Sequence, residues 1–345
     1  MPPTMRAVVL QGPQQLSVED VPIPKLLTGQ ELVRVGACGI CGSDLRYLAG
    51  ENPWAKHTLG YEKPNPPGMV LGHEIGGYRG DTPVGCLAFK SCGRCAECRK
   101  GEMQLCAHTA HLGHGAGWEG QNPGGMAEYC PVWSEHVYEL PQGVSVDEAT
   151  FLDGLAVAVH AARMAGVFPG EQVLLLGGGP IGLLIAQVTG ALGAGEAVVA
   201  DVYETPLACV RELKLGRTVN LGEGGAEALP GDTFAVVFDT TGDLEAQQTG
   251  LAALHRGGTM ILMAGAAEGL TLGPATLAGE RRLMTCSNHR YEDFEIALRL
   301  LADGRVRVGP MITHRFPLEQ AAKAFEVATD KVNTGALKVI LEIAG

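Results

Sequence analysis

The stretch VLLLGGGPIG, residues 173–182, decides the fold of the second half of this 345-residue chain. Four aliphatic residues form a candidate buried strand, and Gly177, Gly179 and Gly182 follow with the spacing G-x-G-x-x-G at the start of an apolar helix. In this pattern the first glycine permits a tight turn, the second lets the backbone approach a pyrophosphate, and the third lets helix and strand pack closely. The stretch, with Pro180 and Ile181 inside it, therefore predicts a dinucleotide-binding loop.

Asp201 ends the next predicted strand, at residues 197–200, and lies 19 residues after Gly182. A carboxylate at this place accepts hydrogen bonds from the adenosine ribose hydroxyls and repels the 2′-phosphate of NADP. No basic residue follows until Arg211. The sequence thus predicts NAD as the cofactor. A glycine-rich turn without a ligand is the alternative, which the surrounding strand and helix signals disfavour.

Strand and helix signals alternate through the rest of this region. Further strands are expected at 234–239 and 259–263, and helices at 181–192, 205–215 and 244–254. This alternation predicts βαβ units and a doubly wound parallel sheet. The first 150 residues are different, because their short apolar runs are separated by glycine and proline, which indicates an irregular β-rich region.

Composition excludes several classes of protein. Hydrophobic residues make up 46% of the chain, charged residues 19%, and the net charge is −12, which argues against a disordered chain and against a general nucleic-acid binder. The apolar run near the amino terminus is too short for a signal peptide, and the glycines and Pro180 interrupt the longest apolar stretch. We therefore expect a cytoplasmic protein that does not bind membranes. In a reducing compartment, the ten cysteines are expected to be metal ligands or buried thiols.

Four of these cysteines lie close together, at positions 92, 95, 98 and 106 of a lobe expected over about residues 86–110. Four thiolates in one short loop can surround Zn²⁺ tetrahedrally and leave no open position, which is the structural arrangement. A redox pair, buried free thiols and a nucleic-acid zinc knuckle are the alternatives. The regular spacing favours a structural zinc site formed by Cys92, Cys95, Cys98 and Cys106.

Two further motifs, GICGSD at 39–44 and GHE at 72–74, precede the four cysteines and the glycine loop. In this order and spacing, the motifs resemble those of the zinc-dependent medium-chain alcohol and polyol dehydrogenases, in the sorbitol-dehydrogenase-like or threonine-dehydrogenase-like branch. The resemblance covers essentially the whole chain. It implies a GroES-like catalytic domain built from residues 1–154 and 290–345, with a Rossmann NAD-binding domain at 155–289 inserted between them.

The resemblance also implies a catalytic zinc. Cys41 and His73 match the first two ligands, and the position of the third ligand is Asp153, which binds the metal directly or through water. Glu74 matches an acidic residue that can approach the zinc from its other side, and Asp44 is expected to hydrogen-bond to His73. A carboxylate at a helix start can instead cap the helix, so that interpretation of Asp153 stays open.

Zinc matters for the expected chemistry because hydride leaves an alkoxide, and ionising an alcohol of pKa ~16 at pH 7 costs ~12 kcal/mol. A Zn²⁺ ion that lowers the pKa of a bound oxygen to roughly 7 removes most of this cost. By resemblance, Ser43 relays the proton. Arg46 stands where a relay histidine is common and is expected to contact phosphate or substrate. Lys338 matches a residue that contacts the pyrophosphate, and Met263 and Gly265 match backbone that faces the nicotinamide.

The expected function is the NAD-dependent interconversion of a secondary alcohol and a ketone, with a polyol, sugar or cyclitol as substrate and two zinc ions per chain. The alternatives are a simple or amino alcohol dehydrogenase, a zinc-free quinone or enone reductase, and a non-catalytic NAD-binding protein. We expect a homo-oligomer, a dimer or tetramer. The candidate pocket residues are Trp54, Trp118, Glu119, His289 and Arg290. The cysteines expected not to bind metal are Cys38, Cys86, Cys130, Cys209 and Cys286. Glycines place His108, His111 and His114 in a loop, so no third metal site is expected there.

Overall fold

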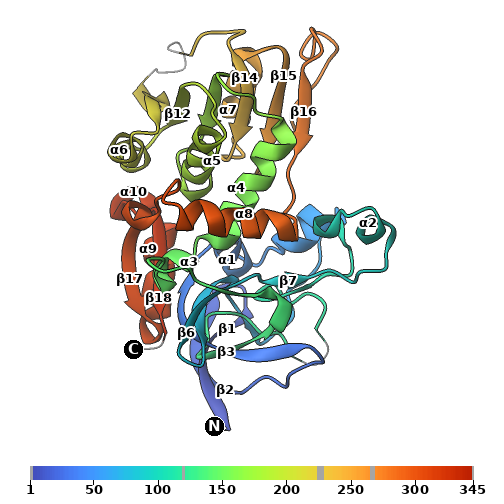
Figure 1. The fold of residues 1–345 in the computed structure, drawn as a ribbon, viewed down its shortest axis with the longest axis vertical. Helices are drawn as coiled ribbons and strands as arrows, with labels where there is room; N and C mark the ends of the chain where they lie inside the picture. The colour runs from blue at the N-terminus through green and yellow to red at the C-terminus, as the bar shows by residue number, and fades with distance from the viewer. Residues whose placement is uncertain (1–2, 119–120, 224–228, 265–268, 344–345) are drawn as a thin grey trace. The chain divides into compact units, whose positions relative to one another are not determined.

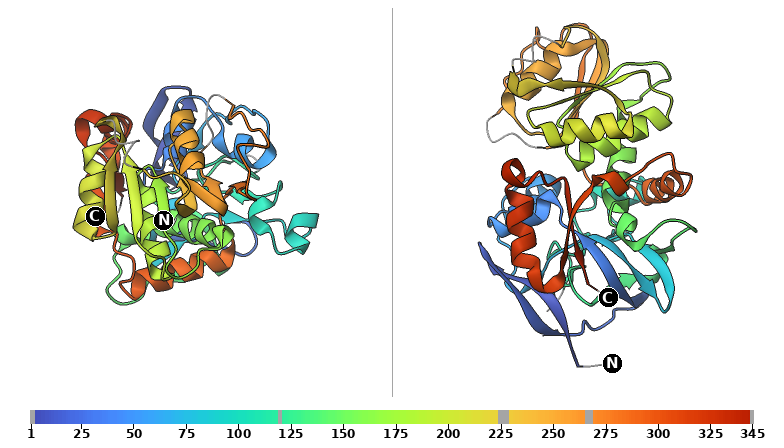
Figure 2. Two further views of the ribbon diagram at one scale, coloured as in Figure 1. Left: turned by 90° about the horizontal axis from the view of Figure 1, so that it is seen from above. Right: turned by 90° about the vertical axis from the view of Figure 1, so that its left-hand side faces the viewer.

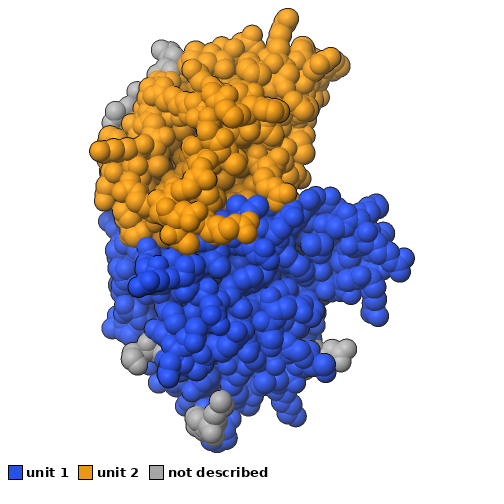
Figure 3. Space-filling view, viewed as in Figure 1, with its two compact units in different colours: residues 1–153, 290–298, 312–345 blue, residues 154–289, 299–311 orange. Residues whose placement is uncertain are grey.

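The computed structural model describes residues 3–118, 121–223, 229–264 and 269–343. The chain divides into two compact units, coloured separately in Figure 3. Unit 1 comprises residues 1–153, 290–298 and 312–345, and unit 2 comprises residues 154–289 and 299–311. The division into a catalytic and a cofactor-binding domain stays a prediction; by packing, residues 299–311 group with unit 2.

A six-stranded parallel sheet forms the centre of unit 2, with the strand order β13-β12-β11-β14-β15-β16. The strands are β11 (Val173–Leu176), β12 (Ala197–Asp201), β13 (Gly216–Asn220), β14 (Phe234–Asp239), β15 (Leu254–Leu262) and β16 (Arg282–Thr285). The chain leaves β11 for β12 on one side and later adds β14 on the other, which makes the carboxyl end of β11 the switch point where such sheets bind ligands. The predicted fold class is confirmed.

The glycine loop joins β11 to α5 (Pro180–Ala191), and Pro180 stands in the first turn of that helix. Gly177 has a φ of +95°, and a Cβ on Gly182 would lie 2.0 Å from the carbonyl oxygen of Gly177. Only glycine fits these two positions, because one needs a left-handed backbone and the other a close approach of helix to turn. The other helices of this region are α4 (Leu152–Ala165), α6 (Glu204–Leu213) and α7 (Leu244–Ala253).

Unit 1 is β-rich, as expected, and its described residues form three sheets. One has the order β2-β1-β4, one is a β7-β8 pair, and the seven-stranded sheet has the order β10-β6-β5-β3-β18-β17 with β9 also paired to β3. The strands are β1 (Thr4–Gly12), β2 (Gln15–Pro22), β3 (Gln30–Gly39), β4 (Met69–Val70), β5 (Glu74–Arg79), β6 (Thr82–Cys86), β7 (Phe89–Lys90), β8 (Ala110–His111), β9 (Tyr129–Trp133), β10 (Val137–Glu139), β17 (Ile312–Pro317) and β18 (Lys338–Glu342).

Both ends of the chain build the large sheet of unit 1. Strand β18 pairs antiparallel with β3, with Ile340 opposite Gly39 and Leu341 opposite Cys38. Figures 1 and 2 show the red carboxyl-terminal strands beside the blue amino-terminal ones. The α-helices associated with unit 1 are α1 (Gly42–Leu48), α2 (Ala96–Arg99), α3 (Val146–Ala149), α8 (Tyr291–Ala302), α9 (Ala321–Thr329) and α10 (Lys331–Thr334).

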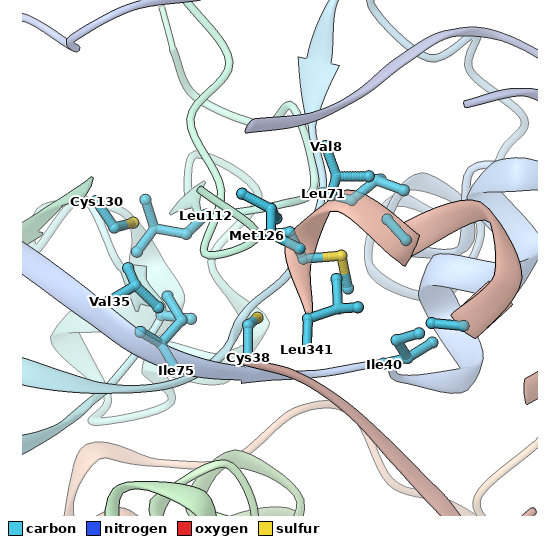
Figure 4. Close-up of a cluster of buried hydrophobic side chains, with 14 of the residues drawn as sticks. Val8, Val35, Cys38, Ile40, Leu71, Ile75, Leu112, Met126, Cys130 and Leu341 are labelled. Atoms are coloured by element: carbon cyan, nitrogen blue, oxygen red, sulfur yellow. The ribbon is translucent and has the colours of Figure 1, made fainter. Parts of the chain in front are cut away.

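The core of unit 1 joins side chains that are far apart in the sequence. Cys38, Ile75, Met126 and Leu341 are buried in one cluster, shown in Figure 4. Burying such side chains contributes about 1.5–3 kcal/mol each relative to exposure, so this cluster fixes β3 and β5. The two strands in turn position the candidate metal ligands, since Cys41 follows the end of β3 and His73 and Glu74 stand at the start of β5. In the described parts of the chain, no helix has both the length and the apolarity needed to cross a bilayer.

Candidate metal centres and cofactor loop

The four-cysteine lobe brings its sulfur atoms together. The Sγ atoms of Cys95 and Cys98 lie 3.4 Å apart, those of Cys95 and Cys106 lie 3.9 Å apart, and those of Cys92 and Cys98 lie 4.0 Å apart. Four sulfurs bound tetrahedrally to zinc at about 2.3 Å would lie roughly 3.8 Å apart. The backbone N–H of Arg94 lowers the pKa of Cys92 to about 6, which favours the thiolate that binds metal. This cluster fits a structural zinc site.

A second cluster of possible ligands is formed by Cys41, His73 and Glu74, whose donor atoms all lie within 4.8 Å of one another. Cys41 is the N-cap of α1, His73 follows β4, and Glu74 begins β5. The expected third ligand, Asp153, lies in the first turn of α4 with its Oδ2 atom 4.0 Å from Nε2 of His73. The structure thus brings Glu74 into the tight cluster, with Asp153 beside His73.

Asp44 supports both sides of this cluster and is fully buried. Its carboxylate accepts hydrogen bonds from the backbone N–H of Cys41, at 2.9 Å, and of Gly72, at 3.3 Å. The distance from Oδ1 of Asp44 to Nδ1 of His73 is 4.0 Å, so the expected hydrogen bond is not formed in this structure. Burial raises the pKa of Asp44 to about 6, although the attraction of His73 opposes the shift.

Lys338 joins this site from β18, because its Nζ atom pairs with Oε2 of Glu74. Only 4% of the Lys338 side chain and 6% of the Glu74 side chain are exposed. Gly39 makes room for the pair, since a Cβ at that position would lie 2.3 Å from Oε2 of Glu74. Burial acts to lower the pKa of Lys338, but the charges of Glu74 and Cys41 and the hydrogen bond to Glu74 together outweigh it, so the pKa is raised. The expected contact of Lys338 with the pyrophosphate stays a prediction, and no local sequence pattern predicts its pairing with Glu74.

At the cofactor loop, the carboxylate of Asp201 accepts a 2.7 Å hydrogen bond from the backbone N–H of Gly178 and a 2.8 Å bond from that of Tyr203. The acid is therefore fixed beside the glycine loop, as the motif requires. Met263 follows β15, and its N–H donates to the carbonyl of Asp239 at 2.8 Å. Gly265, the other residue expected near the nicotinamide, lies outside the described residues.

The remaining predicted site residues are more dispersed. Arg46 forms a salt bridge with Glu51 at 2.7 Å, and Arg290 pairs with Glu102 at 2.5 Å. Trp118 stacks on a second tryptophan, and its indole N–H donates to the carbonyl of His111 at 3.0 Å. Trp54 precedes a short π-helix (Ala55–Leu59), and His289 is buried in unit 2. Glu119 lies outside the described residues.

Two histidines expected in a loop lie next to His73: His111 ends the short strand β8, and His114 lies in the loop that follows. The rings of His111 and His114 stack with centroids 3.8 Å apart, and the His114 ring meets the His73 ring edge to face at 4.6 Å. Burial, followed by the neighbouring His111 and His73 rings, lowers the pKa of His114 well below its ordinary value. The i, i+3 spacing of two histidines was the available signal, but the glycines around them hid where the loop would lead.

Comparison with known proteins agrees with this geometry. Residues 28–142 match the family described as alcohol dehydrogenase GroES-like domain, and residues 180–303 match the zinc-binding dehydrogenase family. A sorbitol dehydrogenase of Mus musculus is 31% identical over 97% of this chain and 95% of its own length. The chain belongs to the zinc-dependent medium-chain dehydrogenases.

Two further members of this family bear on the function. A probable D-xylulose reductase A of Aspergillus clavatus is 30% identical over 94% of this chain and 93% of its own length. The structure of a putative zinc-binding dehydrogenase of Sinorhizobium meliloti bound to NADP is 27% identical in sequence and superposes with a TM-score of 0.85. The match covers 98% of this chain and 99% of the other. The 345-residue chain, as a member of this family, is an oxidoreductase. The expected family, fold and enzyme class are confirmed.

Proposed function

We propose that this dehydrogenase oxidises a secondary hydroxyl of a polyol, sugar or cyclitol to the ketone with NAD, and catalyses the reverse reduction. The observation that carries the proposal is the cluster of one partly buried thiol, one buried imidazole and one buried carboxylate within 4.8 Å. It occurs in a chain that aligns with a sorbitol dehydrogenase along nearly its whole length. An amino alcohol remains the second candidate substrate class, since the sequence motifs also resemble the threonine-dehydrogenase-like branch.

The donor set suits zinc, because thiolate, imidazole and carboxylate are its usual ligands in sites that keep an open position. Cys41, His73 and Glu74 would hold the catalytic ion, and Asp153 would reach it through water or directly. Cys92, Cys95, Cys98 and Cys106 would hold the structural ion. The catalytic ion supplies Lewis acidity, which makes a hydroxyl group easier to ionise beside NAD.

The protein's own side chains orient this centre. Asp44 ties the backbone of Cys41 to that of Gly72, so the thiol and the imidazole keep a fixed relation. Lys338 neutralises the charge of Glu74. This limits the negative charge around the substrate, to which the Cys41 thiolate and the Asp153 carboxylate also contribute. The hydroxyl of Ser43 is buried and has no hydrogen-bond partner among the described residues, which supports the proposal that it accepts the proton of the substrate hydroxyl.

Arg46 stands where a relay histidine is common, but it cannot take the proton from Ser43, because a guanidinium is not a base and Arg46 is paired with Glu51. Cofactor hydroxyls and water would then accept it. The choice of NAD rests on Asp201, since its carboxylate is fixed by two backbone N–H groups beside the glycine loop. A 2′-phosphate there would meet a like charge that cannot easily move away.

We further propose a cytoplasmic homo-oligomer, a dimer or tetramer, that binds neither nucleic acid nor membrane. All ten cysteines are free, which agrees with a reducing compartment. Symmetric homo-oligomers are the commonest assemblies of soluble enzymes. Analytical ultracentrifugation of the purified protein measures the number of subunits directly.

Two matched variants test the proposed function. Cys41→Ser is expected to abolish NAD-dependent polyol oxidation and to reduce the zinc content from two ions per chain to one, while NAD binding persists. Cys92→Ser is expected chiefly to lower thermal stability. A panel of polyols, aldoses, cyclitols, amino alcohols and short alcohols, followed by NADH absorbance, identifies the substrate class. Full activity of Cys41→Ser, or the absence of zinc at the catalytic cluster of the wild type, would overturn the assignment.

A further inference from the structure

His114 places unpaired polar atoms next to the candidate catalytic centre. Both of its ring nitrogens are shielded from solvent, and neither has a hydrogen-bond partner within the described part of the chain. A buried polar group without a partner costs about 1–3 kcal/mol, whereas an apolar side chain of similar size would carry no such penalty. The nitrogens therefore mark a place where a polar group of a ligand would be stabilised.

The backbone fixes where this ring lies. Gly113 has a φ of +71°, and a Cβ on it would lie 2.4 Å from the carbonyl oxygen of Gly72, which directly precedes His73. The N–H of Gly113 donates to the carbonyl of Pro123 at 2.8 Å, so the loop is held on both sides. The loop thus packs its main chain against the segment between β4 and β5, in which His73 lies next to Glu74. The ring of the next residue, His114, lies 4.6 Å from that of His73.

Ring contacts then limit how His114 can turn. It stacks on His111 at 3.8 Å with an interplanar angle of 13°, meets His73 at 4.6 Å, and lies 5.3 Å from the ring of Tyr47. His111 is itself held, because one of its ring nitrogens lies 2.8 Å from the carbonyl oxygen of Leu112. An imidazole packed against three other rings is pre-ordered, so binding through it requires little further loss of conformational entropy.

Ser43 supplies a second unpaired polar atom beside the same ring cluster. Ser43 and Tyr47 are four residues apart on α1, so their side chains lie on one face of that helix, and Tyr47 contacts His114. The Oγ atom of Ser43 is buried and unpaired among the described residues, as the nitrogens of His114 are. The site therefore offers polar groups for more than one hydroxyl.

We infer that His114 binds a second hydroxyl of the substrate, neighbouring the one that is oxidised, and so selects polyols over simple secondary alcohols. A neutral imidazole has one N–H donor and one acceptor, which matches a hydroxyl, itself both donor and acceptor. This inference rests on the proposed function, since it assigns the second hydroxyl relative to the one beside Ser43.

The test compares His114→Phe with His114→Gln. Phenylalanine keeps the ring contacts and removes both nitrogens, whereas glutamine keeps a donor and an acceptor. If the phenylalanine ring does not fit, His114→Leu takes the place of His114→Phe. We expect His114→Phe to lower kcat/KM for sorbitol about 10- to 100-fold, the loss of one well-placed hydrogen bond in a buried site, and His114→Gln to recover part of it. For 2-butanol, which has one hydroxyl, kcat/KM should change less than about 3-fold.

A second readout does not involve turnover. Sorbitol and NADH are both reduced and cannot react, so the affinity of the enzyme–NADH complex for sorbitol can be titrated by NADH fluorescence. His114→Phe should weaken this affinity about 10-fold while zinc content and melting temperature stay near those of the wild type. Equal losses for sorbitol and 2-butanol, or unchanged sorbitol binding, would overturn the inference. A wild type that oxidises no alcohol would instead show that the proposed function itself has failed.

Discussion

The buried Lys338–Glu74 pair yields a quantitative prediction for Lys338→Met. Methionine keeps an unbranched side chain beside Phe151, whose ring lies 5.2 Å from the Lys338 ammonium, but removes the charge. Since 4% and 6% of the two side chains are exposed, Glu74 would be left as a buried charge without its partner. Removing one member of such a pair typically costs 3–5 kcal/mol, so we expect zinc-free protein to lose about 4 kcal/mol of unfolding free energy.

Urea denaturation followed by tryptophan fluorescence measures this loss in the relevant part of the molecule. The three tryptophans, Trp54, Trp118 and Trp133, all lie in unit 1, so the signal reports on the unit that contains the pair. If Glu74 binds the catalytic zinc, the ion replaces the ammonium as counter-charge, and the loss in zinc-loaded protein should be smaller by at least 1 kcal/mol, a rough figure from paired-charge energetics.

Lys323→Met is the matched control, because Lys323 pairs with Glu326 at 3.2 Å on a surface where the two side chains are 63% and 70% exposed. Such exposed pairs contribute about 0.2–1 kcal/mol at most. The double variant Lys338→Met with Glu74→Gln should recover most of the stability lost by Lys338→Met alone. A loss from Lys338→Met no larger than the control's would refute the reasoning that this pair is buried and energetically coupled.

Three other perturbations test separate parts of the structure. Asp201→Ser should raise kcat/KM with NADP relative to NAD by about 10-fold or more, since the like charge facing a 2′-phosphate is gone; an unchanged ratio contradicts the role of Asp201. Gly39→Ala should displace Glu74, because the Oε2 atom of Glu74 would lie 2.3 Å from the new Cβ. Denaturation should show a loss of about 1–3 kcal/mol in unfolding free energy, and metal titration should show weaker binding of one of the two zinc ions. After zinc removal, Cys92, whose pKa is lowered to about 6, should be alkylated by iodoacetamide at pH 7 and much more slowly below pH 6. Cys86 is the control, because burial raises its pKa to about 12 and keeps it unreactive. Mass spectrometry after digestion measures the alkylation of both residues.

Local patterns were enough to predict the centre of unit 2. The strands expected at 173–176 and 234–239 have those bounds as β11 and β14, and the expected helix at 181–192 is α5 shifted by one residue. A buried parallel strand reads as a continuous aliphatic run, and glycine and proline bound it, so the signal is contained in a few neighbouring residues. The polar strand β13 and the exposed edge strand β16 carry no such run and were not predicted.

The candidate site was predictable where motifs carry it and not where the tertiary fold assembles it. Cys41 and His73 were named from their motifs, and the structure brings their donor atoms together with that of Glu74. The pairing of Glu74 with Lys338 joins residues 264 positions apart, and no local pattern records which buried strand will lie opposite which. The place of His114 beside His73 was not predictable for a similar reason, because it depends on a loop packing against Gly72 rather than on the sequence neighbours of His114.

The pairing of β3 with β18 also has a consequence for synthesis on the ribosome. Strand β3 is synthesised early, but the edge of the sheet at Gly39 is covered only when Ile340 of β18 has been synthesised and can pair with it. At roughly 5–20 residues per second, emergence of the last strand follows that of β3 by about 15–60 s. During that interval unit 2 can fold while residues 37–39 of β3 present an open, aggregation-prone edge. Nascent chains stalled before residue 338 should therefore depend on chaperones more than full-length chains do.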